Sequence, residues 1–172
     1  MLQTRQGIGT TVKSDNDLGL ALERKIKKSD LLETLEVRLG LEREASQLAA
    51  VRRTGDDLKK IENCLKDCKI AAKNNDPFQF TKMDIIFHKS IAQATHNKMF
   101  IDLYMNITDE LQNFIDEIMR IKNPVSFENV VHSDLFEAIN AGNPQLALES
   151  VNEYLNNAKE LLSEIGRAHV WT

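Results

Sequence analysis

The chain has 172 residues, of which 42% are hydrophobic and 28% are charged, as in an ordinary globular domain rather than a fibrous or disordered protein. Its formal net charge of −4 argues against avid binding of nucleic acid or acidic membrane by the chain as it stands. No run approaches the roughly 18 apolar residues of a membrane span, and no apolar signal core is present. We therefore expect a cytoplasmic protein, in which Cys64 and Cys68 serve as reduced packing residues.

The first segment, residues 1–13, lacks a helical pattern. Gly7 and Gly9 can supply the positive φ that the tip of a β-hairpin needs. Because a lone hairpin is marginally stable in water, we expect this one to be the remnant of a domain whose beginning is missing. Residues 14–29 are mostly polar and charged, which is typical of a linker.

The segment from residue 30 to residue 163 is predicted to be entirely helical. Apolar side chains recur there at helical intervals, and turns that contain Gly, Asn or Pro separate the repeats. The pattern predicts an all-α antiparallel bundle of about six helices, which cover approximately residues 29–53, 56–74, 77–95, 97–123, 126–141 and 144–163.

The last segment, residues 164–172, breaks the helical pattern. It resembles the translation of a sequencing adapter, so we expect it to be non-native and assign it no function. An ordinary disordered C-terminus is the alternative interpretation.

Asp84 and His88 form the most informative pattern in the chain. Residues four apart on a helix point the same way, so this carboxylate and imidazole can converge on one point, with His132 joining them from the predicted helix 126–141. Carboxylate oxygen and imidazole nitrogen are good ligands for a divalent transition metal. A surface pair, or a buried histidine with a structural role, is the alternative. The apolar residues 85–87 favour a buried helix.

Four segments, in order and spacing, resemble one protein family. Thr4–Val12 is similar to a wing hairpin, Glu36–Glu42 to a first effector-domain helix, Asp84–His88 to a metal-bearing helix, and the segment from His132 to Asn143 to a later histidine helix. Together they resemble the GntR superfamily of transcription regulators, in its FadR-like branch. The resemblance implies a wing remnant at 1–13, a linker at 14–29 and a helical effector-binding domain at 30–163.

The family resemblance also implies a metal site made from one Asp and three His. Asp84, His88 and His132 match three of the positions, but Tyr154 stands where the family has the fourth ligand. A phenol ionises near pH ~10, so Tyr154 needs a strong local cation to ligate as phenolate. Either zinc or nickel is held by three protein groups plus water or effector, or the site has lost its metal and binds effector through hydrogen bonds.

Arg38 lies on the helix that the resemblance places first in the effector domain. A guanidinium there would clamp a carboxylate in bidentate fashion, and Tyr154 would lie at the edge of the same site. The alternative for Arg38 is a salt bridge to Glu42, four residues later on the same helix.

The resemblance implies a regulator that works as a homodimer, senses a small carboxylate and binds DNA only in its full-length form, with Arg5, Gln6 and Gly7 of the wing remnant touching DNA. The competing hypothesis is a helical interaction module whose polar interior is purely structural. An enzyme is not expected, because the chain has no Gly-x-Ser-x-Gly motif and no second carboxylate–histidine pair of the kind that di-iron bundles use.

Overall fold

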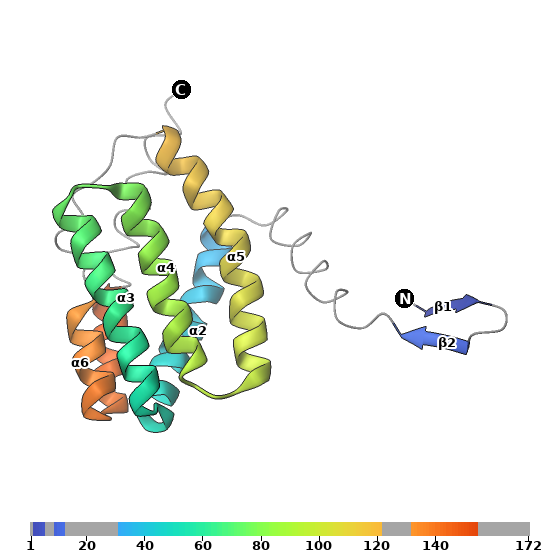
Figure 1. The fold of residues 1–172 in the computed structure, drawn as a ribbon, viewed down its shortest axis with the longest axis horizontal. Coiled ribbons are helices and arrows are strands. Elements are labelled where there is room, and N and C mark those ends of the chain that lie inside the picture. Colours follow the sequence, from blue (N-terminus) through green and yellow to red (C-terminus); the bar gives the residue numbers. More distant parts are fainter. Residues whose placement is uncertain (1, 6–8, 13–30, 122–131, 155–172) are drawn as a thin grey trace.

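The computed structural model describes residues 2–5, 9–12, 31–121 and 132–154. Within these ranges it contains the helices α2 (Leu31–Arg52), α3 (Gly55–Lys73), α4 (Pro77–Gln93), α5 (Lys98–Ile121) and α6 (Ser133–Ala141), followed by a helical stretch at 144–154. Figure 1 shows α3, α4 and α5 side by side, with α2 behind them. The predicted all-α bundle is confirmed. The predicted linker, 14–29, and the predicted non-native tail, 164–172, lie outside the described residues.

Two short strands precede the bundle. β1 (Leu2–Arg5) pairs with β2 (Gly9–Val12) in an antiparallel register that sets Thr4 opposite Thr10. This pairing agrees with the predicted hairpin, whose Gln6 and Gly7 lie outside the described residues.

Side chains at the helix ends explain where α3 and α4 begin. Thr54 and Asp57 form a reciprocal capping box, in which Thr54 Oγ1 accepts from the Asp57 amide and the Asp57 carboxylate accepts from the Thr54 amide. Asp76 caps α4 through a single hydrogen bond that its carboxylate accepts from the Gln79 amide, and Pro77 occupies the first turn, where the missing N–H costs nothing. The predicted boundaries are therefore correct to within one residue at these two starts.

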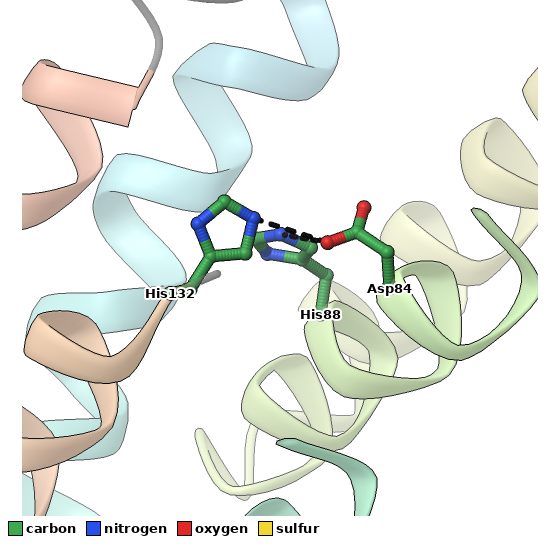
Figure 2. Close-up of side chains that lie close together, drawn as sticks. All are labelled: Asp84, His88 and His132. Carbon is green, nitrogen blue, oxygen red and sulfur yellow. Dashed lines mark hydrogen bonds and ion pairs between the residues drawn. The ribbon is translucent and has the colours of Figure 1, made fainter. Parts of the chain in front are cut away.

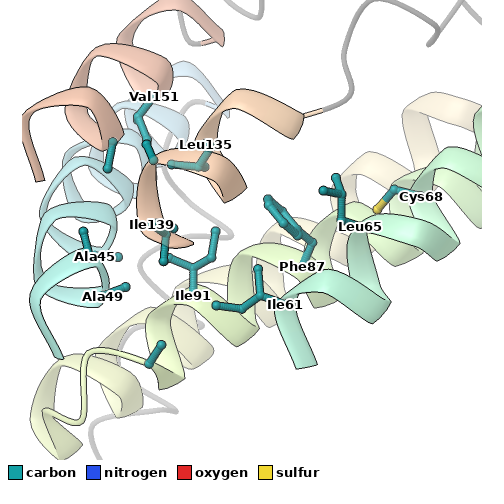
Figure 3. Packing of buried hydrophobic residues seen from close by; sticks show 14 of the residues in the cluster. Ala45, Ala49, Ile61, Leu65, Cys68, Phe87, Ile91, Leu135, Ile139 and Val151 are labelled. Carbon is teal, nitrogen blue, oxygen red and sulfur yellow. The ribbon is translucent and has the colours of Figure 1, made fainter. Parts of the chain in front are cut away.

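The apolar faces of the helices meet in one core. α3 packs along α4, α4 packs against α5, and α2 contacts α4, α5 and α6. Figure 3 shows the residues at the centre of this core, among them Ile61, Phe87, Ile139 and Val151, each of which is fully buried. Cys68 is buried with them, which confirms its predicted packing role.

No helix among the described residues combines the length and the apolar character needed to cross a bilayer.

Candidate functional site

A cluster of polar side chains lies inside the bundle, where apolar packing would otherwise continue. We call it the polar cluster. The side chains that compose it come from α2, α4, α5, the start of α6 and the stretch 144–154, and five of them are at most 9% exposed while Asp84 and Tyr154 are partly buried. Its members are Arg38, Glu42, Asp84, His88, Tyr104, His132 and Tyr154.

Three members of the polar cluster have the geometry of a candidate metal centre. Asp84 and His88 lie one turn apart on α4, and His132 approaches them from the beginning of α6 (Figure 2). The Asp84 Oδ1 atom is 3.0 Å from His132 Nε2 and 3.6 Å from His88 Nε2. One ligand atom from each residue lies within 4.8 Å of the other two. The predicted convergence of these three side chains is therefore present in the structure.

The position of His132 corrects one detail of the sequence analysis. His132 was expected within a helix covering 126–141, but it is the residue immediately before α6, with φ −77° and ψ 47°. Its side chain makes no capping hydrogen bond with α6. The backbone of His132 is not helical, and its ring lies towards α4, where it stacks on Phe87 at a centroid distance of 5.8 Å. Residues 126–131 lie outside the described residues.

Glu42 connects the metal-site side chains to the opposite side of the polar cluster. Its Oε1 accepts hydrogen bonds from Arg38 Nε at 2.6 Å and from the Tyr104 hydroxyl at 2.8 Å. Its Oε2 accepts a hydrogen bond from the Tyr154 hydroxyl at 2.7 Å. His88 Nδ1 lies 3.7 Å from Oε1. Glu42 therefore holds three donors in place and neutralises the buried charge of Arg38.

Sequence reasoning missed the roles of Glu42 and Tyr104. Glu42 was considered only as an alternative partner of Arg38, and Tyr104 was not singled out. The helical periodicity of the sequence gives a signal for both. Glu42 lies on the same helical face as Leu39 and Ala45, and Tyr104 lies on the same face as Ile107, so each is a polar residue on a face that is otherwise apolar and buried.

The charges of the polar cluster shift the protonation of its members. Burial alone would raise the pKa of Glu42, but Arg38 and His88 outweigh it and lower that pKa to about 2. Burial would likewise raise the pKa of Asp84, but the charge of His88 and the hydrogen bond with His132 outweigh burial and lower that pKa. Burial lowers the pKa of His88, yet Glu42 and Asp84 outweigh it and raise that pKa. Burial and the Glu42 carboxylate together raise the pKa of Tyr154 well above 10.

Two buried nitrogens of the polar cluster have no hydrogen-bond partner. They are Arg38 Nη2 and His88 Nε2. A buried donor or acceptor without a partner costs stability, so such atoms mark a place where a ligand completes the structure. A guanidinium nitrogen suits a carboxylate, and an imidazole nitrogen beside a carboxylate suits a divalent metal. The side chains present thus fit both kinds of ligand.

The structure also bears on the two alternatives for Arg38. The salt bridge to Glu42 is present, through Arg38 Nε. The guanidinium nonetheless keeps Nη2 without a partner, so the salt bridge and a role in ligand binding are compatible.

Tyr154 is placed at the edge of the metal-site side chains. Its ring lies 4.3 Å from the ring of His132 between centroids, and its hydroxyl hydrogen is directed at Glu42. A protonated phenol that donates to a carboxylate is a poor metal ligand.

His96, the remaining histidine among the described residues, lies outside the polar cluster. Its Nε2 atom is 2.8 Å from Asp57 Oδ2, and its side chain is 48% exposed. Arg5 lies in β1, while Gln6 and Gly7 lie outside the described residues.

Comparison with known proteins places this arrangement in a family. The family model described as "FCD domain" matches residues 33–157. The chain is 29% identical over 172 residues to the HTH-type transcriptional regulator LutR of Bacillus subtilis, covering 95% of this chain and 78% of that protein. It is 29% identical over 127 residues to the putative L-lactate dehydrogenase operon regulatory protein of Escherichia coli, covering 71% of this chain and 47% of that protein.

A solved structure shows the same fold. Streptococcus agalactiae GntR superposes with a TM-score of 0.64 at 24% sequence identity, covering 92% of this chain and 74% of that chain. The relatives that the chain matches are transcriptional regulators and not enzymes. The chain therefore belongs to the FCD-domain family of GntR-type transcription regulators.

Proposed function

We propose that this chain senses a small carboxylic acid at the polar cluster and transmits its binding to DNA-binding segments of a homodimer. The observation that carries the proposal is the pair of buried nitrogens that make no hydrogen bond, Arg38 Nη2 and His88 Nε2, the second of which lies 3.6 Å from Asp84 Oδ1. Family membership supports the general role, and the E. coli relative is named for an L-lactate dehydrogenase operon. Lactate is a small carboxylate of the kind that Arg38 would bind.

Arg38 is the expected carboxylate-binding residue. Glu42 holds its Nε atom, which fixes the orientation of the guanidinium before any ligand arrives. An acid would then meet a charged donor that loses little side-chain entropy on binding, in surroundings that are largely shielded from water. Tyr154, which donates to the same glutamate, would form one edge of the binding site.

Asp84, His88 and His132 would hold a divalent metal such as zinc or nickel. When bound, the metal would supply a positive centre that attracts the carboxylate of the effector. A metal binds the neutral form of histidine, so its binding would release any proton held by His88. Arg38 then contributes one positive charge and Glu42 and Asp84 contribute two negative charges, which leaves a net charge of −1 for the cation to offset. Because the Tyr154 hydroxyl donates to Glu42, three protein ligands are expected and metal binding should be weak.

Binding at the polar cluster would reach the DNA through the helices. Residues of the polar cluster come from α2, α4, α5, the start of α6 and the stretch 144–154. A ligand bound there would therefore change the packing of these helices against one another. A ligand shifts such an equilibrium only by binding one arrangement better than the other. Arg5, Gln6 and Gly7 remain the expected DNA contacts of the hairpin.

Thermal unfolding of the full chain in the presence of L-lactate, acetate and succinate tests acid binding. An acid present at about 100 times its Kd should raise the melting temperature by roughly 5–10 °C. Arg38→Lys should abolish most of this increase, because an ammonium cannot pair with Glu42 and reach a carboxylate in the same geometry. Arg52→Lys is the matched control: Arg52 bonds the Thr95 carbonyl at the surface, and its variant should respond like the wild type.

Metal analysis of the protein, purified without chelators, tests the metal site. Zinc or nickel added in solution should bind to the wild type and not to His88→Gln or Asp84→Asn. His96→Asn is the matched control, since His96 also pairs with a carboxylate but lies outside the polar cluster. If neither metal nor acid binds, the helical interaction module with a structural interior is the better account.

A further inference from the structure

Four rings meet at the candidate metal centre, in a group that we call the ring cluster. Two are the imidazoles of His88 and His132, and two are the aromatic side chains of Phe87 and Tyr154. Phe87 and the two histidines are at most 9% exposed, and Tyr154 is partly buried. Each of the two aromatic residues contacts both imidazoles.

The contacts in the ring cluster alternate between stacked and edge-on. Phe87 stacks on His132 with the centroids 5.8 Å apart and the planes at 21°, and it meets His88 edge-on at 5.2 Å and 79°. Tyr154 does the reverse: it stacks on His88 at 5.4 Å and 27°, and it meets His132 edge-on at 4.3 Å and 66°. Aromatic rings favour these two arrangements. Each imidazole therefore has one stacked and one edge-on neighbour, which restricts its rotation about the Cβ–Cγ bond.

The hydrogen bond that usually fixes a metal-binding histidine is weak at His88. Such a histidine commonly donates its second ring N–H to a carboxylate or a carbonyl, which sets the ring orientation. The distance from His88 Nδ1 to Glu42 Oε1 is 3.7 Å, too long for a hydrogen bond of this kind. His132 lies just before α6, and its side chain makes no capping hydrogen bond with that helix. Contacts with the aromatic rings are therefore needed to orient the imidazoles.

The two aromatic residues are themselves held in place. Phe87 is 0% exposed and belongs to the apolar core, among the residues that Figure 3 shows. The Tyr154 hydroxyl donates to Glu42 Oε2 at 2.7 Å, which ties its ring to α2. With the rings so held, His132 Nε2 and His88 Nε2 lie 3.0 and 3.6 Å from the same Asp84 oxygen (Figure 2).

We propose that Phe87 and Tyr154 are positioning residues, whose rings hold His88 and His132 in the orientation that binds a divalent metal. This inference rests on the proposed metal site. Tyr154 thus acts on a metal that it does not ligate, through its ring rather than through its hydroxyl. Imidazoles that are oriented before the metal arrives lose little conformational entropy on binding, so removing either aromatic ring weakens metal binding.

Calorimetric titration of the full chain with zinc chloride tests the proposal. Tyr154→Leu removes the ring and should weaken zinc binding by about tenfold, the scale of residues that support metal ligands. Tyr154→Phe keeps the ring without the hydroxyl and should recover most of this loss. Phe87→Leu should weaken binding by a similar factor. Phe100→Leu is the matched control, because it removes a ring stacked on Tyr104, in a pair without an imidazole, and it should bind zinc like the wild type.

The metal-free proteins provide a second readout. Ring currents of Phe87 and Tyr154 shift the NMR signals of the imidazole protons, so Phe87→Leu and Tyr154→Leu should move these signals and Phe100→Leu should not. Thermal unfolding identifies the variants that are folded at the temperature of the titration. Tyr154 lies at the edge of the site, so its two variants keep the test decisive if Phe87→Leu does not fold.

Three outcomes overturn the positioning role alone. They are wild-type zinc affinity in folded Tyr154→Leu, an equal loss of affinity in Tyr154→Phe and Tyr154→Leu, and imidazole signals that do not move in Tyr154→Leu. The second would assign the effect to the hydroxyl instead of the ring. A wild type that binds neither zinc nor nickel overturns the proposed metal site, and the positioning role with it.

Discussion

Glu42 is buried, carries a negative charge and accepts hydrogen bonds from Arg38, Tyr104 and Tyr154. Taking two charges out of water is costly, and the cost is offset only when each charge keeps its partner. The stability of the interior therefore depends on Arg38 and Glu42 together. Their salt bridge also holds the guanidinium in the orientation that the proposed ligand binding requires.

Glu42→Gln tests this dependence at the residue scale. The substitution conserves volume but leaves the Arg38 charge buried without a counter-charge, so the free energy of unfolding should fall by about 3–5 kcal/mol, as measured by urea denaturation. Asp56→Asn removes the partner of Lys59 in an exposed pair and should leave stability unchanged. Equal stability of Glu42→Gln and the wild type would contradict the argument.

Asp57 offers a pH-dependent test away from the polar cluster. Burial alone would raise its pKa, but hydrogen bonds from Thr54 and His96 outweigh burial and lower it. Because the folded-state pKa is lower than the unfolded one, the ionised form contributes stability above the unfolded pKa, and this contribution is lost as pH falls through the folded pKa.

Asp57→Asn should consequently cost about 1 kcal/mol at pH 7, the scale of a helix cap. The difference from the wild type should stay constant down to about pH 4, the ordinary range of an aspartate, and shrink below it. Urea denaturation at a series of pH values measures it. A difference that grows on acidification would show that the carboxylate is not stabilised in the folded state.

At the scale of elements, the turn after α6 joins two helices that both contribute to the site. Gly142 has φ +70°, a backbone conformation that residues with a Cβ rarely adopt. A Cβ built at this position would lie 2.6 Å from Arg53 Nη2, which donates to the carbonyl of Asn140. The glycine therefore permits both the left-handed turn and the close approach of Arg53 from α2.

Gly142→Ala should lower the free energy of unfolding by about 1–3 kcal/mol, through backbone strain and the displacement of Arg53. Gly40→Ala is the matched control, since Gly40 lies within α2, is exposed and has open space around an added Cβ. That variant should be more stable by about 0.5–1 kcal/mol, because alanine favours the helix. Thermal unfolding should thus show opposite signs for the same chemical change, and equal signs would refute this account of the turn.

At the scale of the whole molecule, the acid and the metal are proposed to share one site and should influence each other. Linkage requires that if zinc tightens acid binding by some factor, the acid tightens zinc binding by the same factor. Titrating each ligand in the absence and presence of the other measures both factors. We expect a coupling of about 1–3 kcal/mol, as is typical of linked sites. Independent affinities would mean that acid and metal do not meet at the polar cluster.

The sequence was sufficient to predict the helices because the residues that start and end a helix lie close to one another in the chain. Pro77 and the turn at Gly142 mark boundaries that the structure keeps, and Thr54 with Asp57 shows why α3 begins one residue earlier than its predicted start. The same periodicity that predicts Phe87 and Ile91 as core residues also places Asp84 and His88 on one turn.

Contacts between distant segments were not readable in the same way. His132 and Asp84 lie 48 residues apart, and Tyr154 and Glu42 lie 112 residues apart. Helical periodicity places a side chain on a face of its own helix, but it does not say which other helix that face meets. Tyr104 therefore looked like an ordinary position on α5 until α2 was in place beside it.

By itself, the sequence determined the all-α class, the starts of α3 and α4 to within one residue, and the pairing of a carboxylate with an imidazole on α4. Hydrogen bonds and side-chain spacing within one helix decide these features. Only the tertiary structure decided that Glu42 would join Arg38 to two tyrosines, that His132 would turn inward from just outside α6, and that particular buried atoms would remain without partners. Those features depend on how separate helices pack, and burial gives an unpaired charge or hydroxyl an energetic consequence that it would not have in water.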